Sequence, residues 1–205
     1  MDNTRDIEFT SLHMSALSEL GNIGAGNAVT AMAQMLDIKV DMSVPKVSFL
    51  SFNEVQDALG GAEKLMAAVL VNISSEHING VMMFLVELRE ANTMVGALLN
   101  QEVKVLREME LSALKEIGNI LTGSYLRSLA EMLSTKIDMS VPYLSIDMAG
   151  AILSVPVAEF AMVSDDVLFI ESVFDSDQKD ISGYFILAPD QESFRYIFRT
   201  LGLEA

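Results

Sequence analysis

The sequence contains no cysteine and only two histidines among its 205 residues. Without cysteine the chain has no disulfide, no thiol nucleophile and no thiolate metal site, a usage that fits a reducing compartment. The two histidines, His13 and His77, are too few for a histidine-rich metal site or for two catalytic triads. We therefore expect that the chain itself binds no metal and no cofactor.

Positive charge is also scarce, with 13 Lys and Arg against 29 Asp and Glu and a formal net charge of -16. The resulting field repels phosphate backbones and anionic lipid, which argues against a nucleic-acid partner. The chain starts without the basic and apolar regions of a signal peptide, and its longest apolar stretches, near residues 65–71 and 80–86, are much shorter than the roughly 20 residues that cross a bilayer. We expect a cytoplasmic protein without membrane insertion.

Hydrophobic residues make up 51% of the sequence and charged residues 20%, with only four prolines. This composition is typical of a folded protein and not of a disordered chain. At this length a compact fold buries roughly 70% of the surface of the unfolded chain, so a stable core is expected.

An internal duplication relates two parts of the chain at an offset of 97 residues. Residues 15–48 align with residues 112–145, and 18 of these 34 positions are identical. The shared text reads SAL-x-E-x-GNI early and K-x-DMSVP late. Such a repeat indicates duplication of a whole unit. We expect two homologous halves, about 10–100 and 107–205, in a single pseudo-two-fold symmetric domain that spans residues 1–205.

Each half repeats one order of elements: a long helix, a strand that contains a proline, two apolar runs joined by a turn, and a closing helix. The expected helices cover residues 12–36, 89–99, 108–134 and 190–203, and the expected strands cover residues 38–52, 67–73, 80–88, 135–148, 167–174 and 183–188. Pro45 and Pro142 suggest edge strands or bulges, and Asp190 suits a helix N-cap. The predicted fold class is α+β, a mainly antiparallel sheet with the two long helices on its face.

The two long helices carry the residues that could perform chemistry. At about 100° per residue, one side of each helix is apolar and is assigned to the core. The opposite side of the first helix carries a polar stripe within an arc of about 60°, made of Ser15, Glu19, Asn22 and Gly26. The second helix repeats this stripe unchanged, with Ser112, Glu116, Asn119 and Gly123. We call these sets the first stripe and the second stripe.

A plain solvated face is the simpler interpretation of a single Glu-x-x-Asn pair, because short motifs are weak signals. Two observations favour a function. The exposed residues match between the halves although several core residues differ, and both helices carry glycines, which cost about 1 kcal/mol each relative to alanine and which a purely structural helix does not need. Gly26 and Gly123 lie on the stripes, where a missing side chain lets another surface approach. Gly24 lies on the core side and is assigned to close packing.

The chemistry of such a pair follows from its side chains. Asparagine offers a carbonyl acceptor and an amide donor, so it can orient a water molecule but cannot act as a strong base. Glutamate can pair with a cation. Orientation of water and management of charge are most of what phosphoryl transfer requires. The pair therefore suits hydrolysis of an activated phosphate that is bound, with its metal ion, on another molecule.

The sequence resembles the CheC family of chemotaxis phosphatases, which is related to CheX and to the middle domain of the flagellar switch protein FliM. The motif that carries the resemblance is Ser/Asp-x-x-x-Glu-x-x-Asn, present here from Ser15 to Asn22 and again from Ser112 to Asn119. The resemblance implies dephosphorylation of the aspartyl-phosphate of the response regulator CheY. It also implies that Asn22 or Asn119 aligns the attacking water, that Glu19 or Glu116 pairs with a lysine of the regulator, and that the regulator supplies Mg²⁺. Relatives of the FliM type lack such pairs.

Members of this family also bind CheD, through a segment that looks like Leu144 to Met148 here, with Asp147 as its acid. An ordinary strand end with an exposed carboxylate remains an equal interpretation, since a lone surface acid is weak evidence. The first half has no acid at this place, so such a contact would be one-sided. The alternative function is a binding module without catalysis, either a flagellar switch component or a CheD-docking adaptor.

Overall fold

The computed structural model describes residues 10–36, 40–42, 45–159, 166–176 and 179–203. Its helices are α1 (Ser11–Leu36), α2 (Phe52–Ala58), α3 (Leu88–Leu99), α4 (Glu108–Met132), α5 (Ala149–Glu159) and α6 (Gln191–Thr200). Its strands are β1 (Val40–Met42), β2 (Lys46–Ser51), β3 (Leu65–Ser74), β4 (Gly80–Glu87), β5 (Asp138–Met139), β6 (Tyr143–Met148), β7 (Asp166–Ser176) and β8 (Lys179–Pro189). These elements confirm the α+β class.

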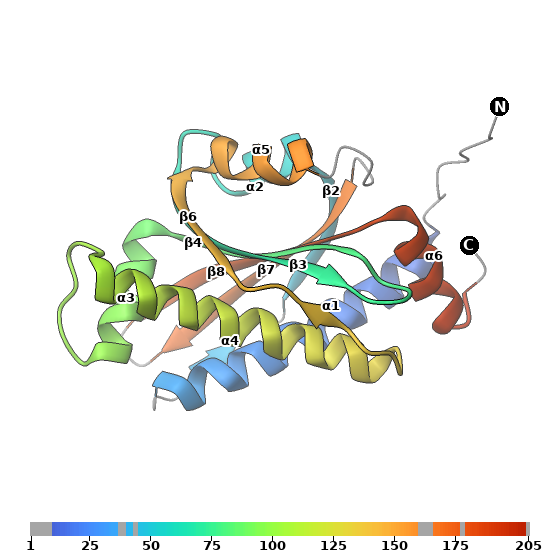
Figure 1. Cartoon of the computed structure of the whole chain (residues 1–205), viewed down its shortest axis with the longest axis horizontal. Helices are drawn as coiled ribbons and strands as arrows, with labels where there is room; N and C mark the ends of the chain where they lie inside the picture. Colours follow the sequence, from blue (N-terminus) through green and yellow to red (C-terminus); the bar gives the residue numbers. More distant parts are fainter. Residues whose placement is uncertain (1–9, 37–39, 43–44, 160–165, 177–178, 204–205) are drawn as a thin grey trace.

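The strands form one eight-stranded sheet in the order β1-β7-β8-β4-β3-β5, with β2 also paired to β7 and β6 also paired to β3. Each of these pairs is antiparallel. The long helices α1 and α4 lie side by side across one face of the sheet, and the shorter α2 and α5 cover the other face (Figure 1). The sheet is therefore the middle of three layers.

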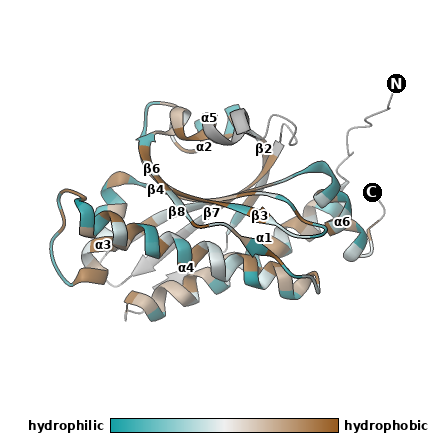
Figure 2. Ribbon diagram, in the orientation of Figure 1, coloured by the Kyte–Doolittle hydropathy of each residue, from teal (hydrophilic) through white to brown (hydrophobic). Residues whose placement is uncertain are grey.

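Both faces of the central strands are buried, as the continuous apolar runs in the sequence require. Every residue of β4 from Gly80 to Val86 is buried. Phe84 belongs to the core shared with α1, α3, α4 and α6, whereas its neighbours Met83 and Leu85 belong to the core shared with α2 and α5. Figure 2 shows the hydrophobic residues running along these central strands. The expected hairpins are confirmed as β3–β4 and β7–β8.

The two halves exchange strands. Val47 of β2 lies opposite Ile170 of β7, and Leu144 of β6 lies opposite Val69 of β3. Val47 and Leu144 are equivalent residues, 97 positions apart, and Val69 and Ile170 are equivalent residues, 101 positions apart. The edge strand of each half therefore pairs with the hairpin of the other half. Each hairpin therefore has its outer edge covered by a strand of the other half.

The expected strands over residues 38–52 and 135–148 are wrong in their extent. In the second half Ser140, Val141 and Pro142 separate β5 from β6, and in the first half residues 43–44, which lie outside the described residues, fall between β1 and β2. Both prolines do precede edge strands, because β2 pairs only with β7 and β6 only with β3 in the described part of the sheet. The prolines thus end one short strand before the next begins.

The helices α2 and α5 were not predicted. The start of α2 is fixed by a capping box, in which Ser51 Oγ accepts from the backbone N–H of Glu54 and Glu54 Oε2 accepts from that of Ser51 at 2.9 Å. This reciprocal pair satisfies two backbone donors at the helix start. The four helices that were predicted are confirmed to within a few residues, and Asp190 caps α6 as expected, accepting from the N–H of Ser193 at 2.7 Å.

Candidate active site

The helices α1 and α4 run antiparallel and meet at equivalent residues. The hydroxyl of Ser124 donates to the backbone carbonyl of Asn27 at 3.0 Å, and these two residues are 97 positions apart. On one side of this contact Gly24 packs against Tyr125. Residue numbers therefore increase along α1 in the direction in which they decrease along α4, so the two helices are antiparallel. A pseudo-two-fold axis passes between Asn27 and Ser124.

Each polar stripe lies on its helix away from the core. Ser15, Glu19, Ser112 and Glu116 are exposed, whereas Asn22, Gly26, Asn119 and Gly123 are half-buried. Apolar residues on the opposite side are in the core, among them Leu17, Leu20, Leu114, Ile117 and Tyr125, although Ala31 is only half-buried. The division of both helices into an apolar and a polar side is therefore confirmed.

The structure keeps the two stripes apart. Asn22 and Asn119 each lie five residues before the contact between Asn27 and Ser124, on opposite sides of it. At 1.5 Å per residue, the two asparagines are offset by about 15 Å along the helix direction. Each stripe thus forms a candidate site of its own, with one glutamate and one asparagine.

Glycines next to the asparagines allow each long helix to lie close to the sheet or to the other long helix. A Cβ at Gly21 would lie 2.7 Å from Val47 Cγ2, and a Cβ at Gly118 would collide with Val69. A Cβ at Gly24 would lie 2.5 Å from the ring of Tyr125. The inference that a structural helix does not need these glycines is therefore wrong at Gly21 and Gly118, because the helix axis can approach the sheet only where no side chain intervenes. Only the close packing assigned to Gly24 was anticipated.

The two glutamate–asparagine pairs differ in detail. In the second stripe the amide Nδ2 of Asn119 donates to Glu116 Oε2 at 3.5 Å, a long hydrogen bond that leaves the Asn119 carbonyl oxygen for another donor. In the first stripe the carbonyl oxygen Oδ1 of Asn22 is buried and has no hydrogen-bond partner among the described residues. The two pairs thus differ: the Asn119 amide is held by its glutamate, whereas the Asn22 carbonyl oxygen is buried.

Asp147 lies exposed on β6, where its carboxylate accepts from the backbone N–H of Met148 at 2.8 Å. The same strand carries exposed apolar side chains: Tyr143 is 60% exposed and Met148 is 44% exposed. The equivalent residue of the first half is Leu50, which packs against the core beneath α2 and α5. An exposed acid at this position therefore occurs in the second half alone.

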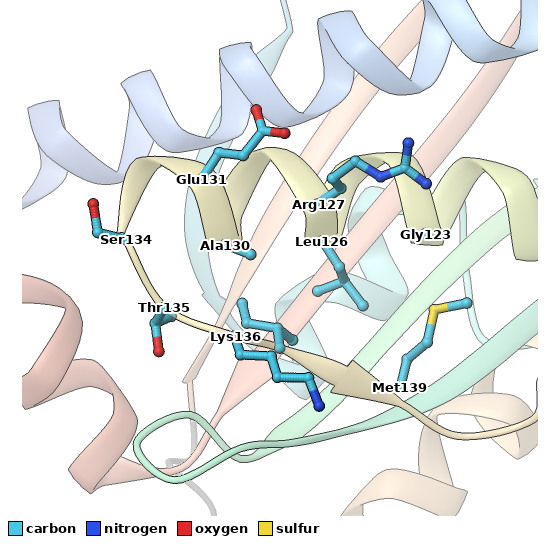
Figure 3. Close-up of a pocket in the computed structure, with 10 residues that line it drawn as sticks. Gly123, Leu126, Arg127, Ala130, Glu131, Ser134, Thr135, Lys136 and Met139 are labelled. Atoms are coloured by element: carbon cyan, nitrogen blue, oxygen red, sulfur yellow. The ribbon is translucent and has the colours of Figure 1, made fainter.

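A cavity of about 640 Å³ opens beside the second stripe, between α4 and the segment that leads into β5. Gly123 belongs to both the stripe and the cavity. Figure 3 shows Arg127 and Glu131 along the α4 rim, with Lys136 and Met139 across from them. Sequence reasoning missed this extension, although Arg127 follows Gly123 by one helical turn. Because acidic and basic side chains share the rim, the cavity has no single charge preference.

Within the described ranges, no three His, Asp or Glu side chains gather as they would around a metal ion. His13 is buried with its ring against Phe198, and its Nδ1 accepts from the backbone N–H of Thr10 at 3.1 Å. His77 lies in the β3–β4 turn and stacks on Tyr196. None of the helices in the part of the chain that the structure describes combines the length and apolar character needed to cross a bilayer.

The sequence and the fold both have known counterparts. The model of the CheC-like family matches residues 12–49 and 109–146, one segment in each half, which confirms the duplication. The chain is 37% identical over 196 residues to the CheY-P phosphatase CheC of Bacillus subtilis (strain 168), an alignment that covers 92% of this chain and 93% of that protein. It is 30% identical to the flagellar motor switch phosphatase FliY of the same organism, over 66% of this chain but only 36% of that longer protein.

Solved structures share the architecture. FliY of Thermotoga maritima superposes with a TM-score of 0.75 at 21% identity, covering 96% of this chain and 98% of that one. The FliM middle domain of H. pylori superposes with a TM-score of 0.70 at 9% identity, covering 94% of this chain and 99% of that one. At such identities the agreement concerns the fold.

Proposed function

Because the chain belongs to the CheC-like family, we propose that it hydrolyses the aspartyl-phosphate of the response regulator CheY. The observation that carries the proposal is the presence of two complete stripes on the outward sides of an antiparallel helix pair, in a chain 37% identical to a CheY-P phosphatase. The stripes suit an activity that needs access to a group held by a second protein.

In the proposed reaction the oxygen of a water molecule attacks the phosphorus of the phosphoaspartate. A new P–O bond forms, the bond between phosphorus and the aspartyl oxygen breaks, and the electron pair leaves with the aspartate carboxylate. The proton lost by the water passes to the released inorganic phosphate or to solvent. The phosphoaspartate is already activated, so the catalyst has to orient the water and no covalent intermediate with this chain is needed.

Asn22 and Asn119 are proposed to orient the water through their amide groups, since a neutral carboxamide fixes a direction without removing a proton. Glu19 and Glu116 are proposed to pair with a lysine of the regulator, which aligns the regulator on the helix. Their exposure leaves both carboxylates accessible to such a cation. The Mg²⁺ that the reaction requires is proposed to come with the regulator.

The remaining members of the stripes are proposed to contact the regulator. Ser15 and Ser112 are exposed one turn before the glutamates, and their hydroxyls donate to the carbonyls of Ser11 and Glu108 at 2.9 Å. Their small side chains leave the glutamates uncovered. Gly26 and Gly123, on the other side of the asparagines, leave room for the regulator backbone.

The test is the rate at which phosphorylated CheY loses its phosphate, with and without this protein. We expect acceleration by the wild type, a partial loss in Asn22→Ala and in Asn119→Ala, and no acceleration by the double variant. Binding of CheY without any acceleration would contradict catalysis and favour the alternative of a binding module, either a switch component or an adaptor. Circular dichroism of each variant checks that the fold is kept.

A second partner, CheD, is proposed at β6. The supporting observation is that Asp147 is exposed on a strand that also carries exposed apolar side chains and whose outer edge has no pairing strand in the described sheet. Titration of this protein with CheD is expected to give binding that Asp147→Arg abolishes. Glu102→Arg, at a carboxylate that is 77% exposed in another part of the chain, is the matched control and is expected to leave binding unchanged. Equal binding by both variants would exclude this surface.

A further inference from the structure

Two large apolar side chains stand in the open at the start of the motif helices. Leu12 is 61% exposed in the first turn of α1, and Met109 is 58% exposed in the first turn of α4. They are 97 residues apart, so they occupy the same position in the two halves. Single exposed apolar residues are common on protein surfaces, but their recurrence at equivalent positions of two diverged halves needs a reason.

Both side chains lie on the same side of the helix as the glutamate of their stripe. Leu12 precedes Glu19 by seven residues, and Met109 precedes Glu116 by the same number. Seven residues turn a helix within about 20° of two full turns and advance it by about 10 Å. Ten residues separate each apolar residue from the asparagine of its stripe, a distance of about 15 Å along the helix.

The fold does not use these side chains. Among the described residues, neither belongs to the two hydrophobic cores or packs against them, whereas Met14 and Ala113, further along the same helices, do. Replacing them with polar residues would not weaken the core. Their apolar character is therefore unexplained by packing within the described part of the chain.

We propose that Leu12 and Met109 are the apolar anchors through which the phosphorylated regulator docks on the first and the second stripe. The inference rests on the proposed function, because it takes the regulator as the occupant of the stripes, and continuity of each anchor with its stripe is what connects them. An exposed apolar residue beside a polar stripe supplies the central buried contact that protein interfaces use for affinity, while the polar residues supply register.

The geometry also describes the partner surface. The asparagine reaches the phosphoryl group, so the regulator must offer an apolar depression about 15 Å from its phosphoaspartate. Leucine and methionine have similar volume, and the flexible methionine adapts to a depression shaped for either. One regulator surface can therefore dock on both stripes.

The experiment isolates each site and then removes one anchor at a time. In the Asn22→Ala background only the second stripe is intact, and Met109→Ser is expected to raise KM for phosphorylated CheY about tenfold with kcat unchanged, while Leu12→Ser changes neither. In the Asn119→Ala background the two results should exchange. Val141→Ser, at an apolar residue that is 82% exposed outside both helices, is the matched control and should have no effect in either background.

A second measurement separates the anchors from the chemistry. Titration of CheY carrying beryllofluoride, a stable mimic of the phosphoryl group, gives the dissociation constant without turnover, and it should rise about tenfold with Met109→Ser in the Asn22→Ala background. If the anchor variants leave KM and the dissociation constant unchanged, the docking role of Leu12 and Met109 is wrong, whereas the proposed phosphatase activity is not contradicted. If binding depends on the anchors but the protein does not accelerate phosphate loss, the docking role is supported and the proposed function is contradicted. Absence of any binding would overturn both.

Discussion

Phe84 and Phe185 lie directly opposite each other in the β4–β8 pair, with their ring centroids 5.3 Å apart. Each is the equivalent of the other, because the two hairpins are related by an offset of 101 residues. The pseudo-two-fold axis of the molecule therefore passes between these two rings, and it passes between Asn27 and Ser124 on the helix layer. Where the axis crosses the helices, the halves have diverged, since Asn27 of α1 corresponds to Ser124 of α4.

Gly24→Ala should destabilise the fold. The new Cβ would lie 2.5 Å from the Tyr125 ring, which is fully buried and cannot move aside, and overpacking of this kind costs about 1 to 3 kcal/mol even though alanine favours the helix by about 1 kcal/mol. Urea unfolding measures the difference. Adding Tyr125→Leu to Gly24→Ala should recover part of the loss if the contact is the cause, and no recovery would point to another origin.

Tyr125→Phe should stabilise the protein by roughly 1 kcal/mol, because the Tyr125 hydroxyl is buried without a hydrogen-bond partner among the described residues. The same burial raises the pKa of Tyr125 above its ordinary value. The ring keeps its contact with Phe185, whose centroid is 5.5 Å away. Thermal unfolding monitored by calorimetry checks the expected rise in Tm, and a lower Tm would mean that the hydroxyl does have a partner.

Gly123→Ala should separate stability from function. A Cβ there would lie 3.4 Å from Met139 Cε, an ordinary contact, so the gain in helix propensity of about 1 kcal/mol should be realised. If Gly123 leaves space for the regulator, the same change should slow dephosphorylation at the second site. Parallel measurements of urea unfolding and of CheY-P decay in the Asn22→Ala background test this, and a stabilised variant with full activity would refute the role of the gap.

Asn119→Ala should cost more turnover than Asn22→Ala. The Asn119 amide is held by Glu116 at 3.5 Å with its carbonyl free, whereas the Asn22 carbonyl is buried and must rotate outward before it can hold a water. A group that is already in its catalytic position needs no reorganisation to reach the transition state, so it stabilises that state more. The ratio of the two single-variant rates at saturating CheY-P measures the difference, and a larger loss in Asn22→Ala would reverse the assignment.

Glu90 should make the stability of the folded protein depend on pH. Burial raises its pKa, helped by Glu87 and opposed by a hydrogen bond from the Ser182 backbone and by Lys64 and Arg89. The folded protein therefore binds more protons than the unfolded chain above the ordinary pKa of 4.5, and stability falls as pH rises from there through the raised pKa.

Glu90→Gln removes that titration but keeps an acceptor for the Ser182 N–H. The variant should therefore gain stability relative to wild type at pH 7 and lose this advantage near pH 4. Urea unfolding of both proteins at the two pH values measures the double difference. A gain that is equal at both pH values would mean that proton binding at Glu90 is not its cause.

The elements that sequence reasoning found are those with a long regular pattern. The helices α1 and α4 extend over about seven turns, so their apolar and polar sides could be separated by period alone. The helices α2 and α5 follow edge strands directly, with no residue between strand and helix, and α2 has only seven residues. The capping box from Ser51 to Glu54 was the available signal for α2, and its serine-to-glutamate spacing could have ended the predicted strand there.

The stripes were predicted because their spacing is local, but the surfaces beside them were not. Leu12 and Met109 are apolar, and an apolar residue at a helix start is assigned to a core unless tertiary structure shows it exposed. The roles of Gly21 and Gly118 also depend on Val47 and Val69, which are distant in sequence. The strand exchange depends on pairing between the halves, and no local pattern specifies that register.

The strand exchange has a consequence for synthesis on the ribosome. When the first half of the chain has emerged, β2 has no partner, because the residues of β7 that pair with it lie 115 to 125 positions later. The outer edge of β3 also stays open until β6 is made. Open edges invite pairing with other chains, so the nascent first half must be kept from its neighbours until β6 and β7 have been made. The two halves consequently complete their fold together, as one unit, in spite of the two-part sequence.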